Sequence, residues 1–287
     1  MCDDLIHPGL VEDHRLSRRN FGLTAVVLAT LPGSALAQAN VTEKDVSIKT
    51  PDGTCDAALY VPNGQGSWPA VLVWPDIMGL RPAFRDMGRR LAAMGYVVLV
   101  PNPFYRSAHA PVIGESFDFS NPEQRARLMG YRGAMSDAGV DSDANAYVAF
   151  LDAQPQTSKT RKVGVQGYCM RGALSFRTAA ALPGRIAAVG SFHGGNGLVT
   201  KDANSPHLLI AKTNAAFLVC QAQNDDKQMP QMKDDLKAAF AAAKHTATVD
   251  VYAADHGWCV PGGQVYNAAE AERAWSNLGK LYQTSLA

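Results

Sequence analysis

The stretch that decides the fold reads Val163-Gly164-Val165-Gln166-Gly167-Tyr168-Cys169-Met170-Arg171-Gly172. An apolar strand leads into a turn with Cys169 at its centre, and a helical pattern over 173–182 follows directly. Such a strained turn holds a nucleophile above a sheet, and small residues flank it because a Cβ there would strike neighbouring elements. The dipole of the following helix favours the thiolate. The stretch predicts a nucleophilic Cys169; the alternative is a small buried cysteine in a tight turn.

Strand and helix patterns alternate on both sides of this turn. Strands are predicted at 45–49, 57–61, 70–74, 96–100, 162–166, 186–192, 216–221 and 248–252, and helices at 84–94, 143–151, 173–182, 232–243 and 268–282. The first two strands predict an antiparallel hairpin, and the stretch 105–139, which has no clear period, predicts a loop. The alternation predicts an α/β fold, with a mostly parallel central sheet and helices on both faces. In such a sheet the site lies beyond the carboxyl ends of the strands.

Two further polar segments follow predicted strands. Asn224-Asp225-Asp226 comes after the strand at 216–221, and His256-Gly257 comes soon after the strand at 248–252. Nucleophile, acid and histidine in this chain order are typical of α/β-hydrolases, in which the histidine takes the nucleophile's proton and the acid orients its ring. The Ala-x-Asn-Asp register favours Asp225 as the acid, whereas the spacing to Pro230 favours Asp226. We predict Asp225.

Five ordered segments between residues 45 and 285 resemble the dienelactone hydrolase family, also called carboxymethylenebutenolidase-like proteins. They read WPDIMGLRP (74–82), GYVVLVPNPFYR (95–106), GYCMRG (167–172), SFHGG (191–195) and HGW (256–258). The resemblance implies an α/β-hydrolase fold and a hydrolase that cleaves a small ester or lactone through an acyl-enzyme. It implies Cys169 as nucleophile and His256 as base, with no cofactor.

The resemblance also implies the groups around the nucleophile. The oxyanion hole is expected from the backbone N–H groups of Ile77 and Met170. Asp76 stands where the family usually has a glutamate that contacts the resting thiol, and it is one methylene shorter. Arg171 stands where the family usually has glycine. These two departures, together with the undecided acid, motivate an alternative in which the chain is a non-catalytic binding protein with a hydrolase fold.

Four positions bear on how the substrate is bound. Arg106 matches a family arginine that binds the substrate carboxylate, but the position of the second family arginine is Val260. One arginine holds a carboxylate less firmly, which makes a carboxylesterase or thioesterase acting on uncharged substrates the nearest alternative. Arg81 could substitute, although its place at a helix start indicates a structural role. His193 follows a strand end and is expected to line the pocket, with a structural role as the alternative.

The first residues of the chain read as a targeting segment. Ser17-Arg18-Arg19-Asn20-Phe21 precedes the apolar run 22–31, and Ala35-Leu36-Ala37 offers a cleavage site before Gln38. The run is shorter than the ~20 residues of a membrane span. The paired arginines resemble a twin-arginine signal. We therefore expect an export signal over 1–37, a hydrolase domain over 38–287, the twin-arginine machinery as partner of the precursor, a periplasmic location and no stable membrane association after cleavage.

Charge and cysteine content narrow the remaining function classes. The chain has 27 Lys+Arg and 26 Asp+Glu, so its net charge of +1 offers no electrostatic footprint for nucleic acid. The expected partner is a small molecule. No group of residues has metal-ligand spacing, and no glycine-rich loop fits a phosphate, so neither metal nor cofactor is expected. An exported protein can form disulfides, and the sequence does not decide whether the four mature cysteines, Cys55, Cys169, Cys220 and Cys259, do so.

Overall fold

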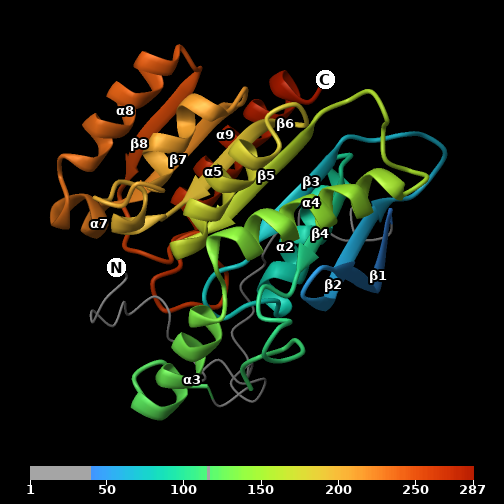
Figure 1. Cartoon of the computed structure of the whole chain (residues 1–287), viewed down its shortest axis with the longest axis horizontal. Helices are drawn as coiled ribbons and strands as arrows, with labels where there is room; N and C mark the ends of the chain where they lie inside the picture. Colours follow the sequence, from blue (N-terminus) through green and yellow to red (C-terminus); the bar gives the residue numbers. More distant parts are fainter. Residues whose placement is uncertain (1–39, 115–116) are drawn as a thin grey trace, which may run out of the picture.

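Eight strands form one sheet in the computed structural model, which describes residues 40–114 and 117–287 (Figure 1). The strands are β1 (Val41–Thr50), β2 (Gly53–Pro62), β3 (Ala70–Trp74), β4 (Val97–Pro101), β5 (Val163–Tyr168), β6 (Ile186–Phe192), β7 (Ala216–Ala222) and β8 (Ala247–Tyr252). Their order across the sheet is β1-β2-β4-β3-β5-β6-β7-β8. The export signal expected over 1–37 lies outside the described residues.

The strand directions agree with the sequence prediction. β1 pairs antiparallel with β2, and β2 pairs antiparallel with β4. Every neighbouring pair from β4 to β8 is parallel. All five residues of β3 and of β4 are buried, because helices cover both faces of a parallel sheet and leave no side of the strand for water. The predicted hairpin and the predicted mostly parallel sheet are both confirmed.

The helices divide between the two faces of the sheet. Their bounds are α2 (Pro82–Ala93), α4 (Asp137–Ala153), α5 (Gly172–Ala181), α8 (Met232–Ala243) and α9 (Ala268–Ser285). Leu72 and Trp74 of β3 point into the apolar core shared with α4, α5 and α8. Val71 and Val73 point into the core shared with α2 and α9. The alternation of side chains along a strand thus builds one core on each face.

The predicted loop over 105–139 is wrong in part. A helix, α3 (Pro122–Gly133), lies away from the sheet, and α4 begins at Asp137 rather than near 143 (Figure 1). Leu128 is the one fully buried residue of α3, so the helix carries no apolar period that a sequence pattern could reveal. The sequence marks this helix only at its first turn. The Asn121 side chain accepts hydrogen bonds from the N–H groups of Glu123 and Gln124, and Pro122 occupies the first turn.

Short helices stand at the carboxyl ends of three neighbouring strands. The 3₁₀ turn η3 (Cys169–Arg171) follows β5, the 3₁₀ turn η4 (Gly195–Gly197) follows β6, and α7 (Gln223–Gln228) follows β7. These short elements bring residues from separate parts of the chain to one edge of the sheet. Beyond them, α6 (Pro206–Leu209) and the turn η5 (Ile210–Lys212) connect β6 to β7. Among the described residues, no helix has the length and apolar character needed to cross a bilayer.

Candidate active site

Cys169 occupies a strained turn between β5 and α5. Its φ of 56° lies in the left-handed region, which few residues other than glycine adopt. A Cβ on Gly167 would lie 2.0 Å from the backbone oxygen of Arg171, and a Cβ on Gly172 would lie 2.3 Å from Ser191 Oγ. Only glycine fits at either position. The turn therefore packs as closely against its neighbours as the sequence pattern implies. Cys169 lies directly beyond the carboxyl end of β5.

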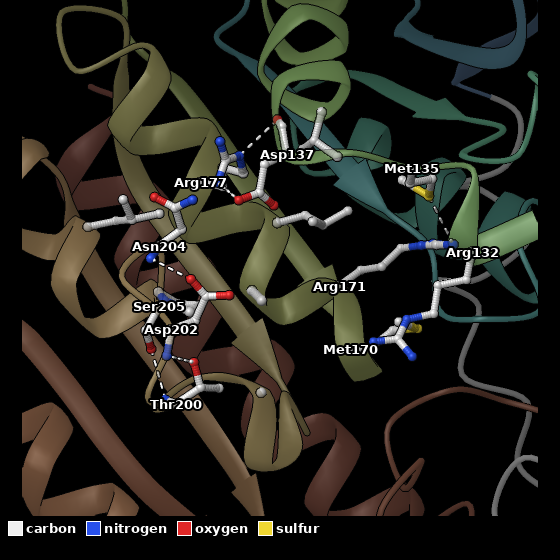
Figure 2. Close-up of a pocket in the computed structure, with 16 residues that line it drawn as sticks. Arg132, Met135, Asp137, Met170, Arg171, Arg177, Thr200, Asp202, Asn204 and Ser205 are labelled. Atoms are coloured by element: carbon white, nitrogen blue, oxygen red, sulfur yellow. Dashed lines mark hydrogen bonds and ion pairs between the residues drawn. The ribbon is translucent and has the colours of Figure 1, made fainter. Parts of the chain in front are cut away.

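The two residues after Cys169 border a cavity of about 300 Å³ (Figure 2). Met170 and Arg171 line it from the turn, and residues of α3, α4, α5 and the segment before α6 complete its wall. Figure 2 shows Arg171 and Arg132 near Met170, while Arg177 lies farther along the cavity beside Asp137. A substrate held in this cavity would lie next to the nucleophile turn.

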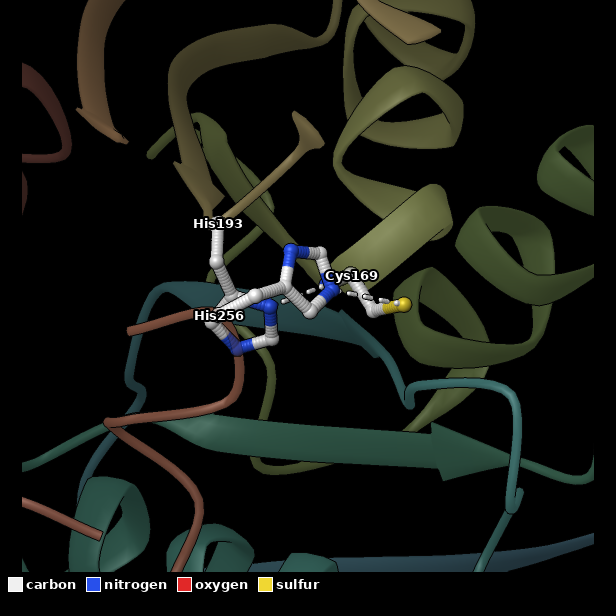
Figure 3. A group of neighbouring side chains, drawn as sticks. All are labelled: Cys169, His193 and His256. Atoms are coloured by element: carbon white, nitrogen blue, oxygen red, sulfur yellow. Dashed lines mark hydrogen bonds between the residues drawn. The ribbon is translucent and has the colours of Figure 1, made fainter. Parts of the chain in front are cut away.

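A buried hydrogen-bonded chain links Cys169, His256 and Asp225. His256 follows β8, and its Nε2 lies 3.2 Å from Cys169 Sγ (Figure 3). Its Nδ1 lies 2.7 Å from Oδ2 of Asp225, which stands in α7 directly after β7. Asp226 points elsewhere and pairs with Lys233 at 2.7 Å. Of the two candidate acids, the structure thus brings Asp225 to the histidine.

The environment of His256 favours its charged form. Burial alone would lower the pKa of this imidazole, since it removes the solvent that stabilises the cation. The negative charge on Cys169 and the hydrogen bond to Asp225 oppose burial and raise the pKa of His256 to about 10. A histidine that keeps its proton beside a thiolate forms an imidazolium–thiolate pair, which is an activated form of a cysteine nucleophile.

Asn224 holds the two loops of this chain together, and sequence reasoning missed it. Its Oδ1 accepts the backbone N–H of His256 at 2.9 Å and that of Asp225 at 3.1 Å. One side chain thus fixes both the acid and the base relative to β7 and β8. Asn224 stands inside the quoted Ala-x-Asn-Asp segment, but its role depends on a contact with a loop 32 residues away.

His193 stabilises the nucleophile turn through a hydrogen bond to the turn's backbone. It follows β6 with a φ of 38°, and its Nδ1 accepts the backbone N–H of Cys169 at 3.0 Å. An accepting Nδ1 carries no proton, so this contact sets the tautomer of a neutral His193. His193 is buried and packs edge-on against His256. These contacts agree with the structural alternative for His193, and its pocket-lining role stays a prediction.

Cys169, His193 and His256 form a group of side chains that could together hold a metal ion. The ligand atoms of Cys169, His193 and His256 lie within 4.8 Å of one another. Sequence spacing did not reveal this group, because its members follow three different strands. Nitrogen and thiolate ligands suit zinc. A metal bound by Cys169 Sγ and His256 Nε2 would replace the hydrogen bond between these two atoms. The group therefore fits proton transfer to and from the thiol.

Ile77 and Met170, the expected oxyanion-hole residues, pack in one apolar cluster. Ile77 is the third residue after β3, and no acceptor within the described residues bonds to its backbone N–H. Met170 is the second residue of η3, where a backbone N–H has no partner inside the helix. Both N–H groups are thus available to an incoming oxygen atom. Their role in binding it stays a prediction.

Asp76 does not make the expected contact with the thiol. Arg81 donates to both of its oxygens, at 2.6 and 2.9 Å, and the backbone N–H of Met78 donates to Oδ1 at 2.9 Å. These bonds hold the loop between β3 and α2, and Arg81 stands at the start of that helix. The shorter carboxylate is therefore committed to a structural pair, and the structural role foreseen for Arg81 agrees with this geometry.

Arg106, the residue expected to bind a substrate carboxylate, is bound by carboxylates of the protein itself. Its guanidinium lies 2.6 Å from Asp52 and 2.7 Å from Asp143, and its three nitrogens all donate to these two carboxylates. Two carboxylates already neutralise this guanidinium and use a donor from each of its nitrogens, so it is poorly placed to hold the carboxylate of a substrate. The prediction of a substrate-binding Arg106 is therefore not supported by the structure. Val260, at the second arginine position, is buried and apolar.

The four cysteines of the described residues are all free and buried. Cys55 accepts a hydrogen bond from the Tyr147 hydroxyl group at 3.2 Å. Burial raises the pKa of the thiols of Cys55 and Cys220 to about 12, which keeps both protonated and unreactive. Cys259 packs in an apolar core and forms no disulfide. No disulfide joins any two of these four cysteines, so Cys169 keeps a free thiol.

A cysteine–histidine–acid chain above the carboxyl ends of a mostly parallel sheet defines a hydrolase of the α/β-hydrolase fold. The order of these residues along the chain agrees with that class. The family assignment follows from comparison: the model of the dienelactone hydrolase family matches residues 55–286, and the chain belongs to this family. It is therefore a hydrolase, and the hydrolase class and family inferred from sequence are both confirmed.

Known relatives and solved structures resemble between about half and most of the chain. A Synechocystis protein, provisionally named carboxymethylenebutenolidase, is 27% identical over 85% of this chain and 98% of its own length. The carboxymethylenebutenolidase of a Pseudomonas species is 36% identical over 45% of this chain and 51% of its own length. A crystal structure from Klebsiella pneumoniae, provisionally described as a dienelactone hydrolase, superposes with a TM-score of 0.73 at 24% identity, covering 85% of this chain and 98% of that one.

Proposed function

We propose that this protein hydrolyses a small ester or lactone through a thioester formed on Cys169. The observation that carries the proposal is the continuous chain from Cys169 Sγ to His256 Nε2 at 3.2 Å and from His256 Nδ1 to Asp225 at 2.7 Å. The three side chains already lie in hydrogen-bond contact, so little reorganisation precedes attack. A thiolate nucleophile, a base and an acid that orients the base are the parts that acyl transfer requires.

The proposed reaction has two halves. The Cys169 thiolate attacks the carbonyl carbon, and the N–H groups of Ile77 and Met170 bind the oxygen as it gains negative charge. Each such donor contributes about 3 kcal/mol to the transition state. His256 gives its proton to the leaving alkoxide, which departs from an ester or stays attached in an opened lactone. His256 then takes a proton from water, which attacks the thioester and releases Cys169.

Substitution of the nucleophile tests this function directly. Cys169→Ala should lower kcat/KM for 4-nitrophenyl acetate by about 10³-fold or more, because the covalent route is lost. Cys259→Ala is the matched control, since Cys259 is a second buried thiol three residues after His256 and belongs to no step. Equal activity of the Cys169→Ala variant and the control would contradict the proposal.

A second candidate, a carboxylesterase or thioesterase acting on uncharged substrates, has one observation in its favour. The two positions that would bind a substrate carboxylate by family resemblance are Arg106, which is held by Asp52 and Asp143, and the apolar Val260. Saturation kinetics on carboxylated lactones and on neutral 4-nitrophenyl esters separate the candidates. Turnover of neutral esters alone would exclude the lactonase activity.

We further infer that residues 1–37 export the protein in folded form to the periplasm. Support comes from Arg18-Arg19, from the apolar run 22–31 and from the Ala-Leu-Ala site before Gln38. Replacing Arg18 and Arg19 by lysine should leave the uncleaved precursor inside the cell, measured by fractionation and immunoblotting. Continued cleavage and export of that variant would contradict the twin-arginine route.

A further inference from the structure

Cys169 and His193 are two of the three residues other than glycine that have a left-handed backbone in the described part of the chain. Their φ angles are 56° and 38°, and the third such residue, Lys244, is the C-cap of α8. An L-residue in this conformation has its Cβ close to a carbonyl oxygen, so surrounding contacts must hold it there. The two strained residues of the site are bonded to each other, because His193 Nδ1 accepts the backbone N–H of Cys169 at 3.0 Å. The conformation of the nucleophile turn therefore depends on His193.

The ring of His193 also contacts the segment that carries the base. It lies against His256, with 4.8 Å between the ring centroids and 66° between the ring planes (Figure 3). Trp258, two residues farther along that segment, lies edge-on to the same ring at a centroid distance of 6.5 Å. His256 and Trp258 follow β8, whereas Cys169 follows β5. One side chain thus contacts both the segment of the nucleophile and the segment of the base.

The backbone that carries His193 is itself fixed. Its N–H donates to the carbonyl oxygen of Cys220 in β7 at 2.8 Å, which anchors the end of β6 to the next strand. The turn continues beside the rest of the site, because a Cβ built on Gly195 would lie 3.6 Å from Cε1 of His256 and 3.8 Å from Oδ2 of Asp225. The turn after β6 therefore borders the nucleophile, the base and the acid.

We propose that His193 is a positioning residue for the reaction, which keeps the Cys169 thiol within reach of the base by accepting the Cys169 N–H. The inference rests on the proposed hydrolase function, since it concerns the nucleophile of that reaction. Without the acceptor, this N–H is unsatisfied in a buried place, and the turn gains free energy by leaving its left-handed conformation. That relaxation moves Sγ away from His256 Nε2, now 3.2 Å distant, and the thiolate loses the imidazolium that stabilises it. His193 thus acts through Cys169.

Variants that keep or remove the acceptor at position 193 test the proposal. Asparagine places its Oδ1 where histidine places Nδ1 and tolerates a left-handed φ, whereas leucine offers no acceptor. Single-turnover measurements with excess enzyme and 4-nitrophenyl acetate report the acylation rate of Cys169 and its half-saturation concentration. His193→Leu should lower the rate by about tenfold or more and change the half-saturation concentration by about threefold or less, because reactive geometry is lost rather than binding. His193→Asn should recover most of the rate.

His193→Gly separates the acceptor from the backbone, since glycine adopts a left-handed φ without strain but offers no acceptor. Its acylation rate should be as low as that of His193→Leu. His245→Leu is the matched control, because His245 is a half-buried histidine just before β8 that contacts Ile210 and Thr213, and its rate should equal that of the wild type. An unchanged rate in His193→Leu would overturn the proposal. Equal rates in His193→Asn and His193→Gly, or an equal loss in His245→Leu, would overturn it as well.

Nitrogen-15 NMR of the wild-type His193 ring gives a reading that does not depend on how well a variant folds. An Nδ1 atom that accepts the Cys169 N–H carries no proton, so the ring should be neutral with its proton on Nε2. A ring that carries a proton on Nδ1 would contradict the proposed bond. Circular dichroism and melting temperature verify that each variant in the kinetic comparison is folded.

The reactivity of Cys169 measured without an ester separates this proposal from the proposed function. Alkylation of Cys169 by iodoacetamide near neutral pH, and the ultraviolet absorbance of its thiolate, should both be lower in His193→Leu than in the wild type and mostly recovered in His193→Asn. If the wild-type protein cleaves no ester while these differences are present, the hydrolase function fails and the positioning role stands. If esters are cleaved and Cys169 is equally reactive in His193→Leu, the positioning role fails and the hydrolase function stands.

Discussion

His256 is the residue on which the chemistry of the site depends, because it touches both the thiol and the acid. Its two ring nitrogens have separate partners, Cys169 on one side and Asp225 on the other. Asn224 fixes its backbone through a part-buried hydrogen bond, and the ring cannot turn without breaking its buried hydrogen bond to Asp225. This arrangement gives Asp225 and Asp226 different roles although they are neighbours in sequence.

Replacing each aspartate by asparagine separates these roles. Asp225→Asn should lower kcat/KM for a neutral ester by about 10³-fold, because an amide no longer stabilises the imidazolium or selects its tautomer. Asp226→Asn removes only a partly exposed ion pair with Lys233 and should change kcat/KM by about twofold or less. Steady-state kinetics of the two variants measure this. A larger loss in Asp226→Asn than in Asp225→Asn would contradict the assignment.

The protonation of His256 gives a second prediction for this residue. The pKa of His256 is raised to about 10, so the ring keeps its proton at neutral pH and loses it only in alkaline solution. Cys169→Ala removes the largest of the raising causes, and the midpoint should fall towards the ordinary value near 6.5. Nitrogen-15 NMR of the imidazole ring measures both midpoints. A wild-type midpoint no higher than that of Cys169→Ala would show that the thiol does not hold the proton on His256.

At the scale of elements, the turn between β5 and α5 sets the position of the nucleophile. Gly172 lets α5 approach β6 so closely that an added Cβ would lie 2.3 Å from Ser191 Oγ and 3.0 Å from the backbone of Gly194. Gly172→Ala should therefore destabilise the protein by about 1–3 kcal/mol through overpacking. Urea unfolding measures the loss.

Gly184→Ala is the control for this prediction, because nothing lies within 4 Å of a Cβ added to Gly184. Its free energy of unfolding should change by about 0.5 kcal/mol or less. Adding Ser191→Ala to Gly172→Ala removes the hydroxyl group that causes the closest contact, and part of the stability should return. Equal stability of the two single variants would show that α5 does not approach β6 as closely as described.

Elements that carry a local pattern could be predicted from sequence, and those fixed by distant partners could not. β3 and β4 are apolar runs between turns, and Cys169, Asp225 and His256 each follow such a run, so their convergence at one edge of the sheet follows from topology. α3 escaped prediction because one buried residue, Leu128, makes no pattern. The partners of Arg106 could not be predicted, because Asp52 and Asp143, which hold it, lie 54 and 37 residues away in sequence.

At the scale of the whole molecule, residues 40–287 contain the complete sheet and both of its helical layers. A chain that begins at Gln38 should therefore melt at the temperature of the full chain and cleave esters at the same rate. A chain that begins at Pro51 lacks β1, which pairs with all ten residues of β2, and should melt at a clearly lower temperature. Calorimetry compares the three chains. Loss of stability in the chain that begins at Gln38 would show that residues 1–37 contribute to the fold.

The most direct test of the account is the site of acylation. The protein is mixed with 4-nitrophenyl acetate, quenched in acid within milliseconds, digested and examined by mass spectrometry. The account predicts one acetyl group, carried by the peptide that contains Cys169, and its absence from Cys169→Ala. An acetyl group on another residue, or full esterase activity in Cys169→Ala with no acylated peptide, would contradict the claim that Cys169 is the nucleophile.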